Sequence, residues 1–302
     1  MKVVLAGGSG ALGRRIAADL TTRGDEVVVL TRSVRPGWPY RQVFWDGATV
    51  GSWAAELAGA AVVNLAGELV DRRPTAANVE LLTRSRVQPT RALACAAAGL
   101  DEPPTVWVQA STLAIYGDGG DAVLDENAPA ADGPAQMAGV ARAWEQAAAE
   151  QPAGRQVVLR TGVVLDRDTP ALDRLAGLTR WGLGGRVGSG RQWVSWLHIA
   201  DLLAIVRRSL DDVTMVGVVH ATSPHPVRNA ELMAALRQVL HRPPVPPTPA
   251  PLVRLGAMLL RTDAALALTG RRCIPSRLLD AGYTFAYPHL VPALQSLLGN
   301  RP

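Results

Sequence analysis

The sequence has 302 residues, of which 48% are hydrophobic and 19% charged, a composition typical of a globular protein with a large core. No apolar run reaches the roughly 18 residues that a membrane-spanning helix needs, and the first one ends at Ala6, too early for a signal peptide. The net charge of +5 comes from dispersed arginines without a basic block, which argues against a nucleic-acid-binding protein. Cys95 and Cys273 lack metal-ligand spacing, so we expect a cytoplasmic protein without a metal site.

Short runs of β-branched and small apolar residues alternate with segments of helical periodicity along the first two thirds of the chain. The runs predicted as strands are Lys2–Ala6, Glu26–Thr31, Ala61–Leu65, Thr105–Ala110, Gln156–Leu165 and Gly217–His220. They are nearly continuous in Val, Leu and Ala, as in strands that helices cover on both faces. The alternation predicts an α/β fold with a doubly wound parallel sheet of the Rossmann type.

The regular alternation ends after Leu165, where glycine-rich and proline-dense stretches follow. We predict a Rossmann domain over residues 1–165, with its sheet completed by residues 197–222. Residues 166–196 and 223–302 are expected to form a smaller C-terminal lobe on the substrate side, closing over the ligand edge of the sheet.

A glycine-rich turn stands between the first predicted strand and the first predicted helix. Its first glycine allows a tight turn, the second lets the backbone approach a pyrophosphate, and the third lets the helix pack near the strand. This order favours a dinucleotide site over a purely structural turn. The residues expected at the pyrophosphate are Gly7, Ser9, Gly10, Ala11, Leu12 and Gly13.

The end of the second predicted strand indicates which dinucleotide binds. NAD-specific sites usually place a carboxylate there, whereas this chain has Arg32 and Ser33. A guanidinium and a hydroxyl can bind a ribose 2′-phosphate through charge-assisted hydrogen bonds, so the sequence favours NADP(H) as the cofactor. The alternative is that Arg32 points into solvent without a ligand.

Further motifs resemble those of extended short-chain dehydrogenases/reductases. They are Asn64-Leu65-Ala66-Gly67, Ser111-Thr112 with Tyr116-Gly117, the run Leu159 to Leu165, and the run Trp196 to Asp201. With the stretch Gly188 to Gln192 and the tail Arg272 to Tyr283, the chain resembles one atypical subfamily over nearly its whole length. That subfamily is the epimerase-family proteins that carry a C-terminal domain of unknown function.

The resemblance implies further cofactor contacts on both sides of the dinucleotide. Leu65, Ala66 and Gly67 would line the adenosine side, and Arg86 takes the place of an asparagine that family members have there. The strand that contains Arg160, Gly162 and Val163 would lie on the nicotinamide side.

Family members with established chemistry use a tyrosine as general acid/base, a lysine four residues later, and a serine or threonine that binds the reacting oxygen. The tyrosine and lysine positions fall on Met137 and Ala141, neither of which transfers protons. Because residues four apart share a helical face, restoring both is expected to raise any turnover. The resemblance assigns oxygen binding to Thr112 and Ser111, with capping of a strand end as the alternative.

Tyr116 is the obvious substitute for the missing tyrosine. An ordinary phenol has a pKa of about 10 and needs a cation or a buried donor to act at neutral pH. The sequence reveals no such partner, so a structural or substrate-wall role is the alternative. His198 is interpreted as a core residue, and Asp201 as the start of a helix.

These features favour an NADP(H)-dependent oxidoreductase that acts on an unknown small carbonyl or alcohol. A nucleotide-sugar epimerase is an alternative within enzymology, and a noncatalytic NADP(H)-binding sensor or scaffold is the alternative outside it. A small-molecule substrate is the expected partner, without nucleic acid or membrane.

Overall fold

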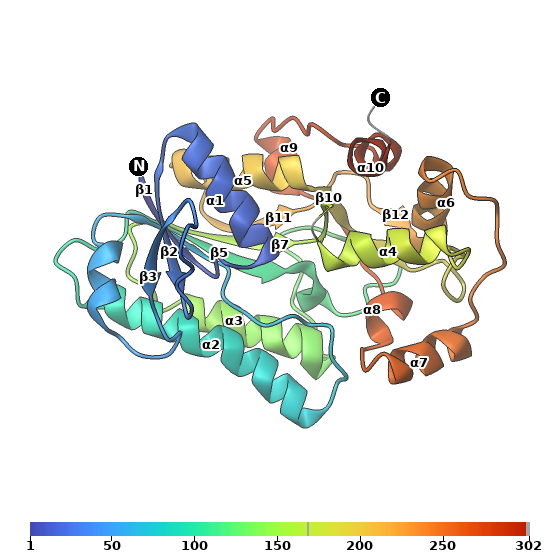
Figure 1. Ribbon diagram of the computed structural model, residues 1–302, viewed down its shortest axis with the longest axis horizontal. Coiled ribbons are helices and arrows are strands. Elements are labelled where there is room, and N and C mark those ends of the chain that lie inside the picture. The colour runs from blue at the N-terminus through green and yellow to red at the C-terminus, as the bar shows by residue number, and fades with distance from the viewer. Residues whose placement is uncertain (168, 300–302) are drawn as a thin grey trace.

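A seven-stranded parallel sheet forms the centre of the computed structural model, which describes residues 1–167 and 169–299. The strand order is β11-β7-β5-β4-β1-β2-β3, so the chain runs outward from β1 in both directions (Figure 1). This order confirms the predicted doubly wound Rossmann architecture. The strands are β1 (Lys2–Ala6), β2 (Glu26–Thr31), β3 (Arg41–Phe44), β4 (Ala61–Asn64), β5 (Val106–Thr112), β7 (Gln156–Thr161) and β11 (Gly217–Ala221).

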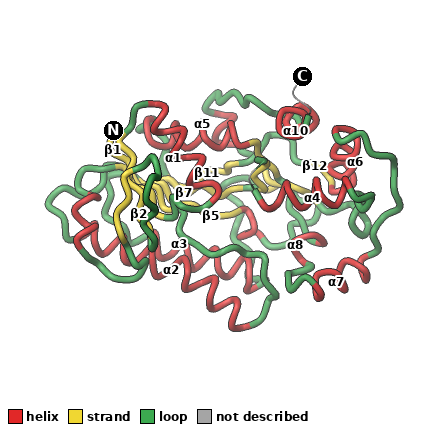
Figure 2. The backbone as a smooth tube through the Cα atoms, in the orientation of Figure 1, coloured by secondary structure: helices red, strands yellow, loops and turns green. Residues whose placement is uncertain are grey.

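Helices cover both faces of the sheet (Figures 1 and 2). One face carries α1 (Ala11–Arg23) and α5 (Ile199–Asp211), and the other carries α2 (Ala76–Ala98) and α3 (Val140–Ala148). Successive residues of a strand point to opposite faces, so Val3 and Leu5 belong to the core on the α1 side and Val4 and Ala6 to the core on the α2 side. Because both faces of the sheet are buried, its central strands are continuous apolar runs.

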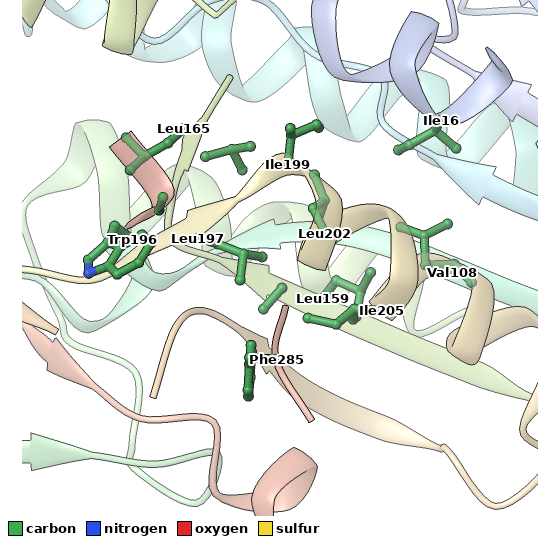
Figure 3. Packing of buried hydrophobic residues seen from close by; sticks show 14 of the residues in the cluster. Ile16, Val108, Leu159, Leu165, Trp196, Leu197, Ile199, Leu202, Ile205 and Phe285 are labelled. Atoms are coloured by element: carbon green, nitrogen blue, oxygen red, sulfur yellow. The ribbon is translucent and has the colours of Figure 1, made fainter. Parts of the chain in front are cut away.

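The core on the α5 side extends from the sheet to the C-terminal segment. Figure 3 shows Leu202 and Ile205 of α5 beside Leu159 of β7 and Val108 of β5, with Phe285 nearby. All five side chains are buried, and each contributes about 1.5–3 kcal/mol relative to an exposed side chain. The segment around Phe285 is therefore packed onto the Rossmann core.

The predicted strand over residues 156–165 is two strands, β7 and β8 (Val163–Leu165). The break lies at Gly162, where a Cβ would lie 2.6 Å from the Ser195 carbonyl oxygen. Beyond it, β8 leaves the main sheet and pairs with β10 (Trp196–His198). The prediction of one continuous strand is therefore wrong, and of residues 197–222 only β11 joins the main sheet. The short edge strand β3 was not predicted, because its four residues are half-buried or exposed.

Short elements beyond the carboxyl ends of the strands form the smaller lobe (Figure 1). Its helices are α4 (Pro170–Arg180), α6 (Asn229–Val239), α7 (Ala250–Leu259), α8 (Ala265–Leu268) and α10 (Leu290–Leu298). The helix α9 (Ser276–Asp280) instead packs beside the edge strand β11, where Arg277 donates to the Val216 and Val218 carbonyl oxygens. Two small strand pairs join them, β9 (Trp193–Val194) with β12 (Val227–Arg228) and β13 (Arg272–Cys273) with β6 (Val123–Leu124). In the part of the chain that the structure describes, none of the helices has the length and apolar character to span a membrane.

Candidate functional site

The turn between β1 and α1 has glycines for different reasons. Gly7 has a φ of +81°, and a Cβ there would lie 2.8 Å from the Leu65 carbonyl carbon. A Cβ at Gly13 would collide with the backbone of Gly7 and Gly8. At Gly10, in contrast, a Cβ would meet only the Gly7 carbonyl oxygen, at 3.4 Å. The fold itself has room for a side chain at Gly10, so the open space there suits a ligand.

The N-terminus of α1 fits an anion. Gly10 is the N-cap and supplies no side-chain acceptor, and the first turn has no acidic residue. Its amide groups and the helix dipole can therefore bind a pyrophosphate. Arg14, which the sequence interpretation missed, donates from Nη1 to the Ser9 carbonyl oxygen at 2.9 Å and so supports the turn. The signal that could have identified Arg14 is its position directly after Gly13 of the glycine-rich turn.

Arg32 lies just beyond the carboxyl end of β2, where its side chain is 74% exposed. Its Nη2 lies 3.6 Å from Oε1 of Glu68. The neighbouring Ser33 is fixed by Thr31, whose hydroxyl accepts from the Ser33 amide at 3.2 Å. An anionic ligand can reach the guanidinium but would compete with the Glu68 carboxylate.

The loop after β4 is supported from below by Arg86 of α2. Asn64 Oδ1 accepts from the Ala66 amide at 3.2 Å, and a Cβ at Gly67 would lie 3.0 Å from Arg86 Cζ. Arg86 donates from Nη2 to the Glu68 carbonyl oxygen at 2.9 Å. Burial lowers the pKa of Arg86 to about 10. The guanidinium of Arg86 is therefore used to hold this loop.

Three residues predicted at the site belong to one buried polar network. Arg160 donates from Nε and Nη2 to the Glu145 carboxylate at 2.9 and 2.8 Å. Ser111 donates its hydroxyl to Oε1 of Glu145, and Arg160 Nη1 donates to the Tyr116 hydroxyl at 2.7 Å. Tyr116 Oη also lies 2.6 Å from Nε2 of His220. The sequence interpretation identified neither Glu145 nor His220 as a member of this network, because their partners come from distant segments.

The hydroxyl group of Tyr116 is bound by Arg160 and His220 in the protein interior. Burial raises the pKa of Tyr116 to about 12, although Arg160 acts in the opposite direction. The ring packs in a small apolar cluster with Leu113, Ile115 and Cys273. A phenol with this pKa and these partners is poorly suited to proton transfer at neutral pH.

A cavity of about 280 Å³ lies between the carboxyl ends of β5 and β7 and the smaller lobe. Thr112 is on its wall, and so are Gly162 and Val163 from the strand predicted on the nicotinamide side. Thr112 Oγ1 accepts from the Ala114 amide at 3.2 Å, and its proton has no acceptor among the described residues. Of the sequence-predicted catalytic residues Thr112, Ser111 and Tyr116, only Thr112 lines this cavity.

Met137 and Ala141 have different surroundings. Met137 lies in a π-helical turn, Ala135–Gly139, and lines the cavity. Ala141 lies in α3, is 1% exposed and packs with Ile115 and Tyr116. That a tyrosine and a lysine at these positions would meet over the cofactor stays a prediction. A lysine at position 141 would bury its ammonium in an apolar cluster.

His198 and Asp201 attach the C-terminal segment to α5. His198 Nδ1 accepts from the Ala200 amide at 3.0 Å, and Nε2 lies 3.0 Å from the Ser296 hydroxyl. Asp201, in the first turn of α5, accepts from the amides of Ala286 and Tyr287. The burial of His198 agrees with the core role predicted for it. The helix α5 begins at Ile199 with His198 as its N-cap, so the prediction that Asp201 begins or caps the helix is wrong.

Comparison with known proteins adds the family. Residues 3–143 match the model described as the NAD dependent epimerase/dehydratase family, and residues 248–297 match a domain of unknown function, DUF1731. The epimerase family protein SDR39U1 of Bos taurus is 35% identical, over 99% of this chain and 100% of that protein. The chain belongs to the NAD-dependent epimerase/dehydratase family. The C-terminal DUF1731 match confirms the predicted resemblance to the atypical subfamily.

Solved structures of this epimerase/dehydratase family share the whole fold. A crystal structure of human SDR39U1 (isoform 2) with NADPH is 33% identical, has a TM-score of 0.88 and covers both chains completely. A structure described as the nucleoside-diphosphate sugar epimerase from Corynebacterium glutamicum is 32% identical, with a TM-score of 0.79, over 99% of this chain and 58% of that chain.

Proposed function

We propose that this family member is an NADP(H)-dependent oxidoreductase that acts on a small carbonyl compound or alcohol. The observation that carries the proposal is the shared cavity of Thr112, Gly162 and Val163, which puts the candidate oxygen-binding hydroxyl beside the strand assigned to the nicotinamide side. The human relative's structure, which contains NADPH, supports the choice of cofactor.

The residues present fit the cofactor's phosphates. The open space at Gly10 and the uncapped N-terminus of α1 would hold the pyrophosphate, and Arg32 would hold the 2′-phosphate. When bound, NADPH supplies a hydride.

The chain's own contribution is to bind the substrate oxygen and to exclude water. The Thr112 hydroxyl can donate to a carbonyl oxygen, while Leu113, Met137 and Val163 supply apolar walls. Oxidation of an alcohol needs a base for the hydroxyl proton, and the ionisable side chains on the described cavity wall are Asp118 and Arg271. Without a tyrosine and lysine pair, reduction of a carbonyl, with water as the proton source, fits this wall better.

Two other functions have specific support. The Corynebacterium relative is described as a sugar epimerase, but epimerisation through a hydroxyl requires deprotonation, and the described residues of the cavity wall include no tyrosine for it. The apolar Met137 at the tyrosine position also supports a noncatalytic NADP(H)-binding sensor or scaffold. We further propose a cytoplasmic location, in keeping with the unpaired Cys95 and Cys273, and a small-molecule partner.

The test has two parts. Fluorescence titration with NADPH and NADH measures cofactor binding, and NADPH absorbance follows turnover with a panel of aldehydes, ketones and 2-oxo acids. We expect NADPH to bind more tightly and at least one carbonyl class to be reduced. Binding without turnover on the whole panel would favour the sensor, and absence of binding would refute the proposal.

A further inference from the structure

The guanidinium of Arg271 forms neither an ion pair nor a cation–π contact with the residues that the structure describes. Arg271 is half-buried and lines the cavity that also contains Thr112. Its Nε atom is buried without a hydrogen-bond partner, and no ion pair among the described residues includes its guanidinium. A buried charge without a counter-charge is costly, and proteins accept this cost mainly at sites of function.

The neighbouring arginines are occupied. Arg272 and Arg228 lie over the ring of Trp193, with Cζ 4.6 and 4.0 Å from its centroid. Arg228 also pairs with Asp121 at 2.6 Å. Arg272 also has a buried Nε without a hydrogen-bond partner, so the ring contact is what distinguishes it from Arg271.

The backbone of Arg271 is held firmly. Its amide donates to the Trp193 carbonyl oxygen at 3.2 Å, and its carbonyl oxygen accepts from the Ser195 hydroxyl at 2.9 Å. The preceding Gly270 donates to Oδ1 of Asp118 at 3.1 Å, and a Cβ at Gly270 would overlap the Trp193 backbone. These contacts fix the starting point of the side chain at the cavity wall, which lowers the entropy cost of binding a ligand.

The surroundings of Arg271 do not neutralise it. Burial lowers the pKa of Arg271, and the Cys273 thiol and the Asp118 carboxylate offset this effect only in part. Asp118 is exposed and already accepts from Gly270. A ligand anion in the cavity would therefore be the close counter-charge that the protein lacks.

We propose that Arg271 binds a carboxylate or phosphate group of the substrate, so that the substrate is a short carbonyl compound with an anionic end. The inference rests on the proposed reductase function for the carbonyl part. A guanidinium binds either anion through paired hydrogen bonds. The apolar side chains of Val70, Met137 and Leu266 on the same wall suit the short carbon chain between the two polar ends.

The kinetic test compares matched substrates with NADPH. Succinic semialdehyde is paired with butanal, and glyceraldehyde 3-phosphate with glyceraldehyde, which separates a carboxylate from a phosphate. The variants are Arg271→Met, the charge-retaining Arg271→Lys and the neighbouring control Arg272→Met. We expect Arg271→Met to lower kcat/KM for one anionic substrate by about 10- to 100-fold, mainly through KM, with the neutral partner changed less than about threefold. Arg271→Lys should recover part of the loss.

A binding test does not depend on turnover. Calorimetry with succinate and with inorganic phosphate, on the NADPH-saturated protein, should detect one anion that Arg271→Met no longer binds and Arg272→Met still binds. If no carbonyl is reduced but this pattern holds, the anion site stands and the reductase function fails. If Arg271→Met instead weakens NADPH, or if neither anion binding nor anion preference depends on Arg271, the proposal is overturned. Thermal denaturation of each variant checks that it is folded.

Discussion

Arg160 of β7 and Glu145 of α3 form a two-point ion pair, with Nε 2.9 Å from Oε1 and Nη2 2.8 Å from Oε2. The same carboxylate accepts from Ser111 of β5, and the same guanidinium donates to Tyr116. The pair therefore joins two central strands to the helix behind them. It fixes the end of β5, where Thr112 enters the cavity.

Glu145→Gln should lower the free energy of unfolding by about 3–5 kcal/mol, because it leaves the Arg160 charge in a poorly solvated site without its counter-charge. Burial acts to lower the pKa of Arg160, but the hydrogen bonds and charge of Glu145 outweigh it and raise the pKa overall. Urea denaturation measures the change. Glu80→Gln, which breaks an exposed pair with Arg84, is the control and should cost less than about 1 kcal/mol. Equal effects of the two substitutions would contradict this account.

The stability of the protein should fall in mild acid because of His198. Burial, helped by the charge of Arg15, lowers the pKa of His198 to about 4. The unfolded histidine, with a pKa near ~6.5, binds more protons between pH 6.5 and 4, so this contribution is complete above pH 6.5 and is lost as the pH falls. Burial gives His220 the same pKa of about 4.

His198→Asn tests this dependence. Asparagine can still accept from the Ala200 amide as the N-cap of α5 but does not titrate. Between pH 6.5 and 4, the variant should lose up to about 1.4 kcal/mol less stability per pH unit than the unmodified protein. Urea denaturation at several pH values measures the slope, and the exposed His241→Asn is the control. An unchanged slope in His198→Asn would show that this histidine does not carry the effect.

Gly10→Val should remove cofactor binding and leave the protein folded. The fold has room for a Cβ at Gly10, but a branched side chain would occupy the space in front of the α1 N-terminus. Calorimetry with NADPH measures affinity, and circular dichroism measures folding. Gly256→Val, at an α7 position with open space, should keep full affinity. Retained affinity in a folded Gly10→Val protein would mean that the phosphates bind elsewhere.

Arg32→Ala should reduce the preference for NADPH over NADH by about 10- to 100-fold, because it removes the charge that neutralises the 2′-phosphate. Glu68→Gln should act in the opposite direction, since Glu68 lies 3.6 Å from the same guanidinium. Fluorescence titration of both variants with both cofactors gives the ratio. If the unmodified protein binds NADPH and NADH equally, the choice of NADP(H) is wrong.

Local patterns were sufficient for most of the central sheet and for the glycine turn. The strands β1 and β2 have the predicted bounds, because each contains a continuous run of Val and Leu. The break at Gly162 could not be predicted, since its cause is the Ser195 carbonyl from a segment more than 30 residues away. The partners of Glu145, and the absence of an ion pair at Arg271 among the described residues, likewise depend on how distant segments are brought together.

One feature of the candidate site was readable from the sequence. Ser111 and Thr112 are consecutive residues of β5, and consecutive strand residues point to opposite faces. Both could not bind the same substrate oxygen, and the structure assigns Ser111 to Glu145 and Thr112 to the cavity wall. The π turn at Met137, in contrast, leaves no signal in the spacing of apolar residues.

Thr112→Val tests the oxygen-binding role without changing the volume of the side chain. If Thr112 donates to the reacting oxygen, kcat should fall by about 10²- to 10³-fold, the usual effect of removing one such donor, while NADPH affinity stays within about twofold. Thr112→Ser keeps the hydroxyl, including the acceptor for the Ala114 amide, and should retain most of the activity. Rates are followed through NADPH absorbance with the best carbonyl of the panel. Ser111→Ala should instead affect mainly the stability of the protein and not kcat, because the Ser111 hydroxyl is bound to Glu145. A Thr112→Val protein with unchanged kcat would exclude Thr112 from the chemistry.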